Sequence, residues 1–207
     1  MDMFVSWTAF AAAPAAMPAS PDVSVAHFAA AASLLDHLAL GRAVDTPALR
    51  AAMCDAFGGS DAEGAWDWKT GYDACEAATV LFLRRFGPGM RGRAGSPVAL
   101  LAMLAKVAAL LPSHTRRSEE SQALQQFSTP IALGFAAATA AAIIPGDLVL
   151  EPSAGTGLLA IFAELSGGRL ALNELAETRA DLLGGVSSSA RRSWRWRRST
   201  ITSADWG

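Results

Sequence analysis

The residues best suited to chemistry lie in one short run, Glu151-Pro152-Ser153-Ala154-Gly155-Thr156-Gly157. The apolar segment before this run predicts a strand, and the segment after it predicts a helix. Glycines let a backbone pass close to a ligand, and a helix N-terminus offers unpaired N–H groups. Because open α/β sheets bind ligands at the carboxyl ends of their strands, the pattern predicts a site for a nucleoside-bearing cofactor.

A second acid, Glu174, ends the next apolar segment. A carboxylate at the end of a neighbouring parallel strand can accept hydrogen bonds from both hydroxyls of a ribose. A solvated strand end is the alternative interpretation of this residue.

Three cofactor chemistries can be compared at the glycine-rich run. A Walker loop is excluded because no Gly-Lys-Ser/Thr follows the glycines. Gly155, Gly157 and Ala160 match the dinucleotide fingerprint, but that fingerprint begins directly at the strand end, and here Glu151 and three further residues intervene. A carboxylate facing the loop would repel a pyrophosphate and would suit the cationic methionine end of S-adenosylmethionine. The residues favour S-adenosylmethionine, while a dinucleotide and a loop without ligand stay open.

The elements that must position this run begin with a helical region, residues 23–112. Helical spacing of apolar residues and Ser/Thr-Pro start signals predict four helices with short connections. The third should end at a turn, Gly87-Pro88-Gly89, and Thr46 should cap the second. The expected helices are Val23–Leu40, Thr46–Phe57, residues 65–86, and a segment from Ser96-Pro97 to Leu111-Pro112.

A polar stretch at residues 113–129 marks a boundary, after which the pattern changes. Strand, glycine-rich loop, helix and strand form half of a doubly wound parallel sheet. The fold class predicted is therefore α/β, an incomplete doubly wound, Rossmann-like sheet preceded by a helical region. The expected elements are helix Pro130–Ile144, strand Asp147–Glu151, helix Leu158–Leu165, strand Arg169–Asn173 and a helix from Leu175.

The two ends of the chain differ from the middle. Residues 1–22 are Ala- and Pro-rich and predict a flexible arm. Residues 184–207 carry five arginines against one acid, Asp205, without helical or strand periodicity. A nucleic-acid or membrane-surface patch is one interpretation of this basic tail, and a shifted reading frame at the end of a truncated gene is the favoured one. The predicted organisation is an arm (1–22), a helical region (23–112), half a sheet domain (113–183) and an unpatterned tail (184–207).

Composition restricts the class of protein. A hydrophobic fraction of 52% with 17% charged residues predicts a packed globular chain. A net charge of -2 argues against a protein built to coat nucleic acid, and no apolar run is long enough for a transmembrane helix. Two cysteines cannot form a disulfide framework, and three histidines without acids or cysteines at ligand spacing predict no metal site. We expect a soluble cytoplasmic protein.

The run EPSAGTG, with NE at the next strand end, resembles the first two motifs of class I methyltransferases. QQFSTP ahead of it is similar to the F/Y-x-T-P motif of adenine-specific DNA amino-methyltransferases. Three longer segments, EGAWDWKTGYDACEAA, HTRRSEESQALQQFSTP and LNELAETRADLL, resemble the N-terminal part of bacterial strawberry-notch-like proteins, in which a methylase-like domain precedes a helicase domain. The resemblance covers residues 23–183.

The resemblance implies a cofactor site for S-adenosyl-L-methionine made by eight residues. Three belong to the F-x-T-P motif and line the cofactor; the others lie in the loop and at the two strand ends, with Glu151 near the methionine moiety and Glu174 on the ribose. The site residues implied are Phe127, Thr129, Pro130, Glu151, Ser153, Gly155, Gly157 and Glu174.

One motif of the resembled family is absent. Its members hold the target amine with a later Asp/Asn/Ser-Pro-Pro-aromatic motif, whose ring stacks on a flipped base. No Pro-Pro occurs in this chain, so no residue is assigned a catalytic role. The resemblance implies a methyltransferase domain acting on DNA adenine, here truncated and weakly active or inactive. The alternatives are a non-enzymatic cofactor- or DNA-binding module of a helicase-type protein, and a nonfunctional gene fragment.

Overall fold

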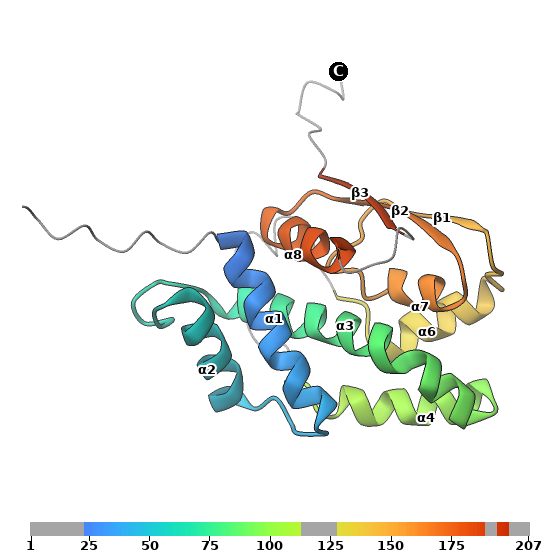
Figure 1. Ribbon diagram of the computed structural model, residues 1–207, viewed down its shortest axis with the longest axis horizontal. Coiled ribbons are helices and arrows are strands. Elements are labelled where there is room, and N and C mark those ends of the chain that lie inside the picture. The colour runs from blue at the N-terminus through green and yellow to red at the C-terminus, as the bar shows by residue number, and fades with distance from the viewer. Residues whose placement is uncertain (1–22, 113–127, 189–193, 199–207) are drawn as a thin grey trace, which may run out of the picture.

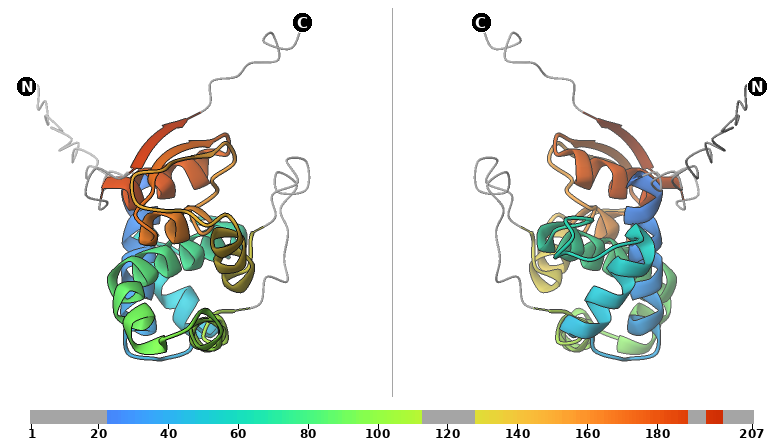
Figure 2. Two further views of the ribbon diagram at one scale, coloured as in Figure 1. Left: turned by 90° about the vertical axis from the view of Figure 1, so that its right-hand side faces the viewer. Right: turned by 90° about the vertical axis from the view of Figure 1, so that its left-hand side faces the viewer.

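The computed structural model describes residues 23–112, 128–188 and 194–198 of the 207-residue chain (Figure 1). These residues form an α/β structure that is mostly helical and has a small parallel sheet. Both views of Figure 2 place the sheet at one end of the molecule, with α7 (Ala160–Leu165) and α8 (Glu177–Ser188) beneath it. Among the described residues, no helix is both long and apolar enough to cross a membrane.

Residues 23–112 contain four helices, as the sequence predicts. They are α1 (Val23–Ala39), α2 (Thr46–Phe57), α3 (Trp68–Ala94) and α4 (Pro97–Ala108). The cap of α2 is Asp45 rather than the predicted Thr46, because the Asp45 carboxylate accepts the Ala48 N–H at 2.9 Å. Ser96 caps α4 in the same way, accepting the Ala99 N–H.

The predicted turn at Gly87-Pro88-Gly89 is wrong, because α3 continues through it to Ala94. Contacts with α7 compensate for the backbone hydrogen bond that a proline cannot donate. Arg84 forms a two-pronged ion pair with Glu164, and Arg91 donates to the Leu165 carbonyl at 2.9 Å. These contacts join residues far apart in sequence, so the local Gly-Pro-Gly signal does not contain them.

Gly87 allows α3 and α7 to approach closely. A Cβ at this position would lie 2.8 Å from Leu165 Cδ1, whereas a Cβ at Gly92, also in α3, would meet nothing within 4 Å. We expect Gly87→Ala to lower the free energy of unfolding by about 1 kcal/mol, because an overpacking cost of about 1–3 kcal/mol exceeds a gain in helix propensity of about 0.5–1 kcal/mol. Gly92→Ala, the matched control, should raise it by about 0.5–1 kcal/mol through helix propensity. Urea denaturation measures both, and equal effects of the two substitutions would contradict the close packing of α3 on α7.

The second part of the chain alternates helices and strands. Its elements are α6 (Ile131–Ala140), β1 (Leu148–Glu151), α7, β2 (Arg169–Glu174), α8 and β3 (Trp194–Arg198). The three strands are parallel in the order β1-β2-β3, with Val149 opposite Leu170 and Leu172 opposite Trp196. Figure 1 shows α7 and α8 on the same side of this sheet. The described residues thus confirm the α/β class and a small parallel sheet. The doubly wound arrangement stays a prediction.

The prediction of an unpatterned segment at residues 184–207 is wrong in two places. Helix α8 extends to Ser188, and residues 194–198 form β3 alongside β2. The alternation Trp194-Arg195-Trp196-Arg197 has the period of a strand, although its composition is unusual for one. The strand is completed by parallel pairing with β2, a segment about twenty residues earlier in the chain. The remaining tail and the arm at residues 1–22 lie outside the described residues.

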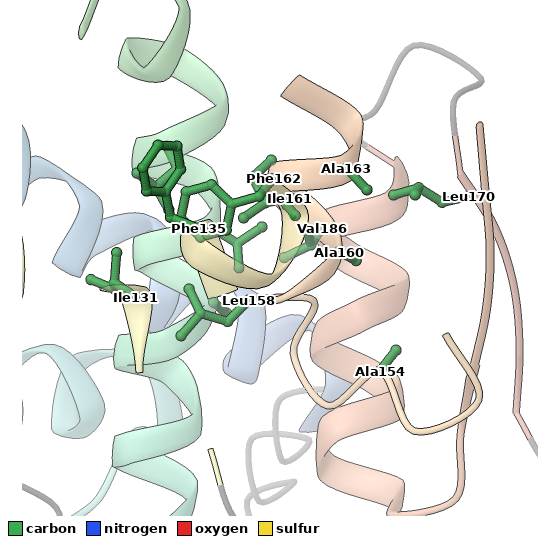
Figure 3. Close-up of a cluster of buried hydrophobic side chains, with 14 of the residues drawn as sticks. Ile131, Phe135, Ala154, Leu158, Ala160, Ile161, Phe162, Ala163, Leu170 and Val186 are labelled. Atoms are coloured by element: carbon green, nitrogen blue, oxygen red, sulfur yellow. The ribbon is translucent and has the colours of Figure 1, made fainter. Parts of the chain in front are cut away.

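A hydrophobic cluster joins the helical region to the sheet region. It contains Leu83 of α3, Leu104 of α4, Phe135 of α6, Phe162 of α7 and Leu170 of β2, all buried. Figure 3 shows Phe135 and Phe162 side by side, and their ring centroids are 5.8 Å apart. Because Ala154 of the glycine-rich loop belongs to the same cluster, the loop between β1 and α7 packs against the helical region.

Candidate functional site

The glycine-rich loop leaves β1 and enters α7 by a path that needs its glycines. Gly155 has φ +57° and Gly157 has φ +94°. Residues with a Cβ atom rarely adopt such positive φ values, because the side chain would clash with the backbone. The Ala154 N–H donates to the Asn173 carbonyl at 2.9 Å, and the Asn173 side-chain amide donates to the Pro152 carbonyl at 3.0 Å. The loop is therefore held against the carboxyl end of β2.

Glu174, predicted as a ribose ligand, is buried with 7% of its surface exposed, which excludes the solvated strand end. Its Oε2 accepts the Gly155 N–H at 2.7 Å, and its Oε1 accepts the Leu175 and Ala176 N–H groups at 2.9 and 2.8 Å. A carboxylate offers about four acceptor positions, so three backbone donors leave about one for a ligand hydroxyl. The side chain ties the glycine-rich loop to the start of α8.

Glu151 ends β1 on the other side of the loop and is half-buried. Burial raises the pKa of its carboxyl group, and the Ser153 backbone N–H opposes this by donating to the carboxylate. Ser153 itself is exposed. The structure therefore brings two acids, Glu151 and Glu174, to the ends of adjacent parallel strands, as the sequence predicts.

The F-x-T-P segment is only partly described. Phe127 lies outside the described residues, Thr129 is half-buried, and Pro130 is exposed at the start of α6. The residue between the motif positions, Ser128, makes the contact with the site, because its Oγ accepts from Arg179 Nη2 at 3.2 Å. Arg179 belongs to α8, and its Nη1 would lie 3.7 Å from a Cβ at Gly155. The segment at residues 128–130 thus lies near the glycine-rich loop.

A buried group of charged and polar side chains links the loop to the helical region. We call it the polar bridge; its members are Lys69, Asp73, Glu76, Thr156 and Arg179. Asp73 lies at its centre, where it accepts from Lys69 Nζ at 2.8 Å and from Arg179 Nε at 3.1 Å. Glu76 Oε2 accepts from Thr156 Oγ1, within the loop, at 3.2 Å. The polar bridge connects α3, the loop and α8.

The electrostatics of the polar bridge centre on Glu76. Burial, followed by the nearby Asp73 charge, raises the pKa of Glu76 to about 7, while Arg179 acts in the opposite direction. The ordinary value for this group is 4.5. The Glu76 carboxyl group can therefore gain or lose a proton near neutral pH, directly beside Thr156 of the glycine-rich loop.

The polar bridge was not predicted from the sequence. Lys69, Asp73 and Glu76 are spaced four and three residues apart, which places them on one face of a helix whose following residues are apolar. Charges on the buried face of such a helix signal a buried partner. The partner, Arg179, is separated from Asp73 by more than one hundred residues, so the sequence does not identify it.

Comparisons with protein-family models, curated proteins and solved structures give no match to this chain. Within the described ranges, no group of three or more His, Cys, Asp or Glu residues could hold a metal ion.

Proposed function

We propose that the chain binds S-adenosylmethionine at the loop Glu151–Gly157, as the cofactor-binding part of a methyltransferase domain that acts on adenine amino groups of DNA. The observation that carries the proposal is the loop itself, held at the carboxyl ends of two parallel strands by the buried Glu174 carboxylate. Ligands of open α/β sheets bind at this edge. The DNA target follows from the resemblance of the motifs alone.

The chemistry of the donor groups fits this cofactor. Gly155 and Gly157 carry no side chain that would occupy the space beside the loop backbone. Glu151 would attract the ammonium group of the methionine moiety, and Glu174 retains acceptor capacity for a ribose hydroxyl. Bound there, the cofactor supplies a sulfonium methyl group for transfer. A pyrophosphate would instead face two carboxylates, while Arg179 is already paired with Asp73.

Calorimetric titration with S-adenosylmethionine tests the proposed site. We expect saturable binding to the wild-type chain and no detectable binding to Gly155→Asp, because the new side chain would carry a negative charge into the loop at a positive φ. Gly92→Asp makes the same chemical change on an exposed turn of α3 and should bind as the wild type does. If the folded wild-type chain takes up no cofactor, the proposal is wrong.

A non-enzymatic cofactor- or DNA-binding module is the alternative function. Because this chain has no Pro-Pro-aromatic motif, the test joins it to a methyltransferase half-domain that carries the motif and measures transfer of a labelled methyl group from the cofactor to an adenine-containing duplex. Transfer supports the methyltransferase, whereas cofactor binding without transfer supports the module.

A further inference from the structure

A pocket of about 650 Å³ lies between α1, the segment joining α2 to α3, and α8. This volume is typical of sites for small ligands. None of its lining residues belongs to the glycine-rich loop. The pocket is lined by His27, Phe57, Asp61, Gly64, Ala65, Trp66, Asp67, Thr70, Glu177, Thr178 and Asp181.

The lining is acidic and partly aromatic. Four of its residues are carboxylic acids and none is lysine or arginine. Asp61 is paired with Arg50 at 3.2 Å, and Asp67 accepts the Thr70 N–H at the start of α3. The other two acids, Glu177 and Asp181, come from α8. A wall of this kind favours a cation over an anion or a neutral ligand.

His27 supplies an independent observation. Only 5% of its side chain is exposed, and its Nδ1 has no hydrogen-bond partner among the described residues. Asp181 Oδ2 lies 4.0 Å from this nitrogen, which is too far for a hydrogen bond. Burial lowers the pKa of His27, although the charges of Asp181, Asp73 and Asp67 oppose the effect and Lys69 reinforces it. A neutral imidazole can accept a proton donor at Nδ1.

We propose that this pocket binds an organic cation through a primary ammonium group, which donates to His27 Nδ1 and to the Asp181 carboxylate. The carbon chain of the ligand packs against Phe57 and Trp66. A free polyamine and the side chain of a lysine in a partner protein share this chemistry. His27 Nδ1 is itself covered in this structure, so the proposal requires the His27 side chain to move before the ammonium group reaches it.

The pocket is distinct from the proposed cofactor site. Asp181 shares one face of α8 with Thr178 and Glu177, because residues three and four positions apart are neighbours around a helix. Arg179, which contacts the polar bridge, projects from a different face of the same helix. The pocket therefore uses no residue of the glycine-rich loop.

Calorimetric titration with spermidine at 0.15 M salt, where long-range attraction between exposed charges is screened, tests the proposal. We expect one saturable site whose affinity falls about ten- to a hundredfold in Asp181→Asn, the range for a lost hydrogen bond to a charged group. Asp55→Asn removes an exposed acid of α2 outside the pocket and should bind as the wild type does. Absence of binding, or equal weakening by both substitutions, would overturn the proposal.

Two further measurements test whether spermidine binds beside His27 and whether its site is separate from the cofactor site. The Nδ1 resonance of His27 should move when spermidine is added, and an unmoved resonance at saturation would overturn the assignment. The Gly155→Asp chain should keep its affinity for spermidine, whereas loss would place the amine at the glycine-rich loop and overturn a separate site. A short lysine-containing peptide that binds more tightly than spermidine identifies a partner protein as the source, and the reverse order identifies a free polyamine.

Discussion

Replacing Asp73 with asparagine should lower the free energy of unfolding by about 3–5 kcal/mol, the range for removing one partner of a buried ion pair. Asp73 is 1% exposed and accepts from both Lys69 and Arg179. The substitution keeps the shape of the side chain but leaves two buried cations without their shared counter-charge. Because small domains are stable by about 5–15 kcal/mol in total, the variant should denature at a markedly lower urea concentration.

Glu76→Gln is the matched control, since Glu76 lies one turn further along the same buried face of α3. We expect Glu76→Gln to lower the free energy of unfolding by less than Asp73→Asn does, because burial already opposes ionisation of Glu76. The pKa of Glu76 is about 7 in the folded chain against an ordinary value of 4.5, so the folded state binds the proton more tightly. The wild type should lose stability relative to Glu76→Gln as the pH rises from about 4.5 to 7, with little further change above. If the two substitutions lowered the free energy of unfolding equally at pH 7, Asp73 would not be the central residue of the polar bridge.

Replacing Glu174 with alanine should lower the free energy of unfolding by about 3 kcal/mol or more. Three backbone N–H groups, from Gly155, Leu175 and Ala176, lose a charged acceptor at once. Hydrogen bonds to charged groups contribute about 1.5–3 kcal/mol each, and the exposure of the site to water after truncation restores part of this. The amide of Gly155 should also exchange with solvent faster, because the glycine-rich loop loses its tie to α8.

Two further variants serve as controls for Glu174→Ala. Glu174→Gln keeps an acceptor oxygen but turns an N–H group toward one of the backbone donors, so an intermediate loss is expected. Asp55→Ala removes an exposed acid and should change stability by no more than about 0.5 kcal/mol. If Glu174→Ala leaves stability and Gly155 exchange unchanged, the carboxylate does not hold the loop. A loss of cofactor affinity in this variant would then report a direct contact with the ligand.

Much of the local structure was predictable because its causes lie within a few residues. The starts of α2 and α4 follow from caps and prolines next to each other in the chain. Strands β1 and β2 follow from apolar runs bounded by turns, and the glycines of the loop mark the two positions of positive φ. The placing of Glu151 and Glu174 at neighbouring strand ends follows from the parallel pairing that such a pattern implies.

The sequence by itself therefore determined the order of the described elements as far as α8, the position of the glycine-rich loop and the two acids beside it. Tertiary structure alone decided that α3 passes through Pro88, that residues 194–198 pair with β2, and that Asp73 meets Arg179 inside the molecule. It also decided that Glu174 is buried and that the acidic pocket forms beside His27. The reason is physical: caps, turns and periodicity act over three or four residues, whereas burial and charge pairing depend on which distant segments pack together.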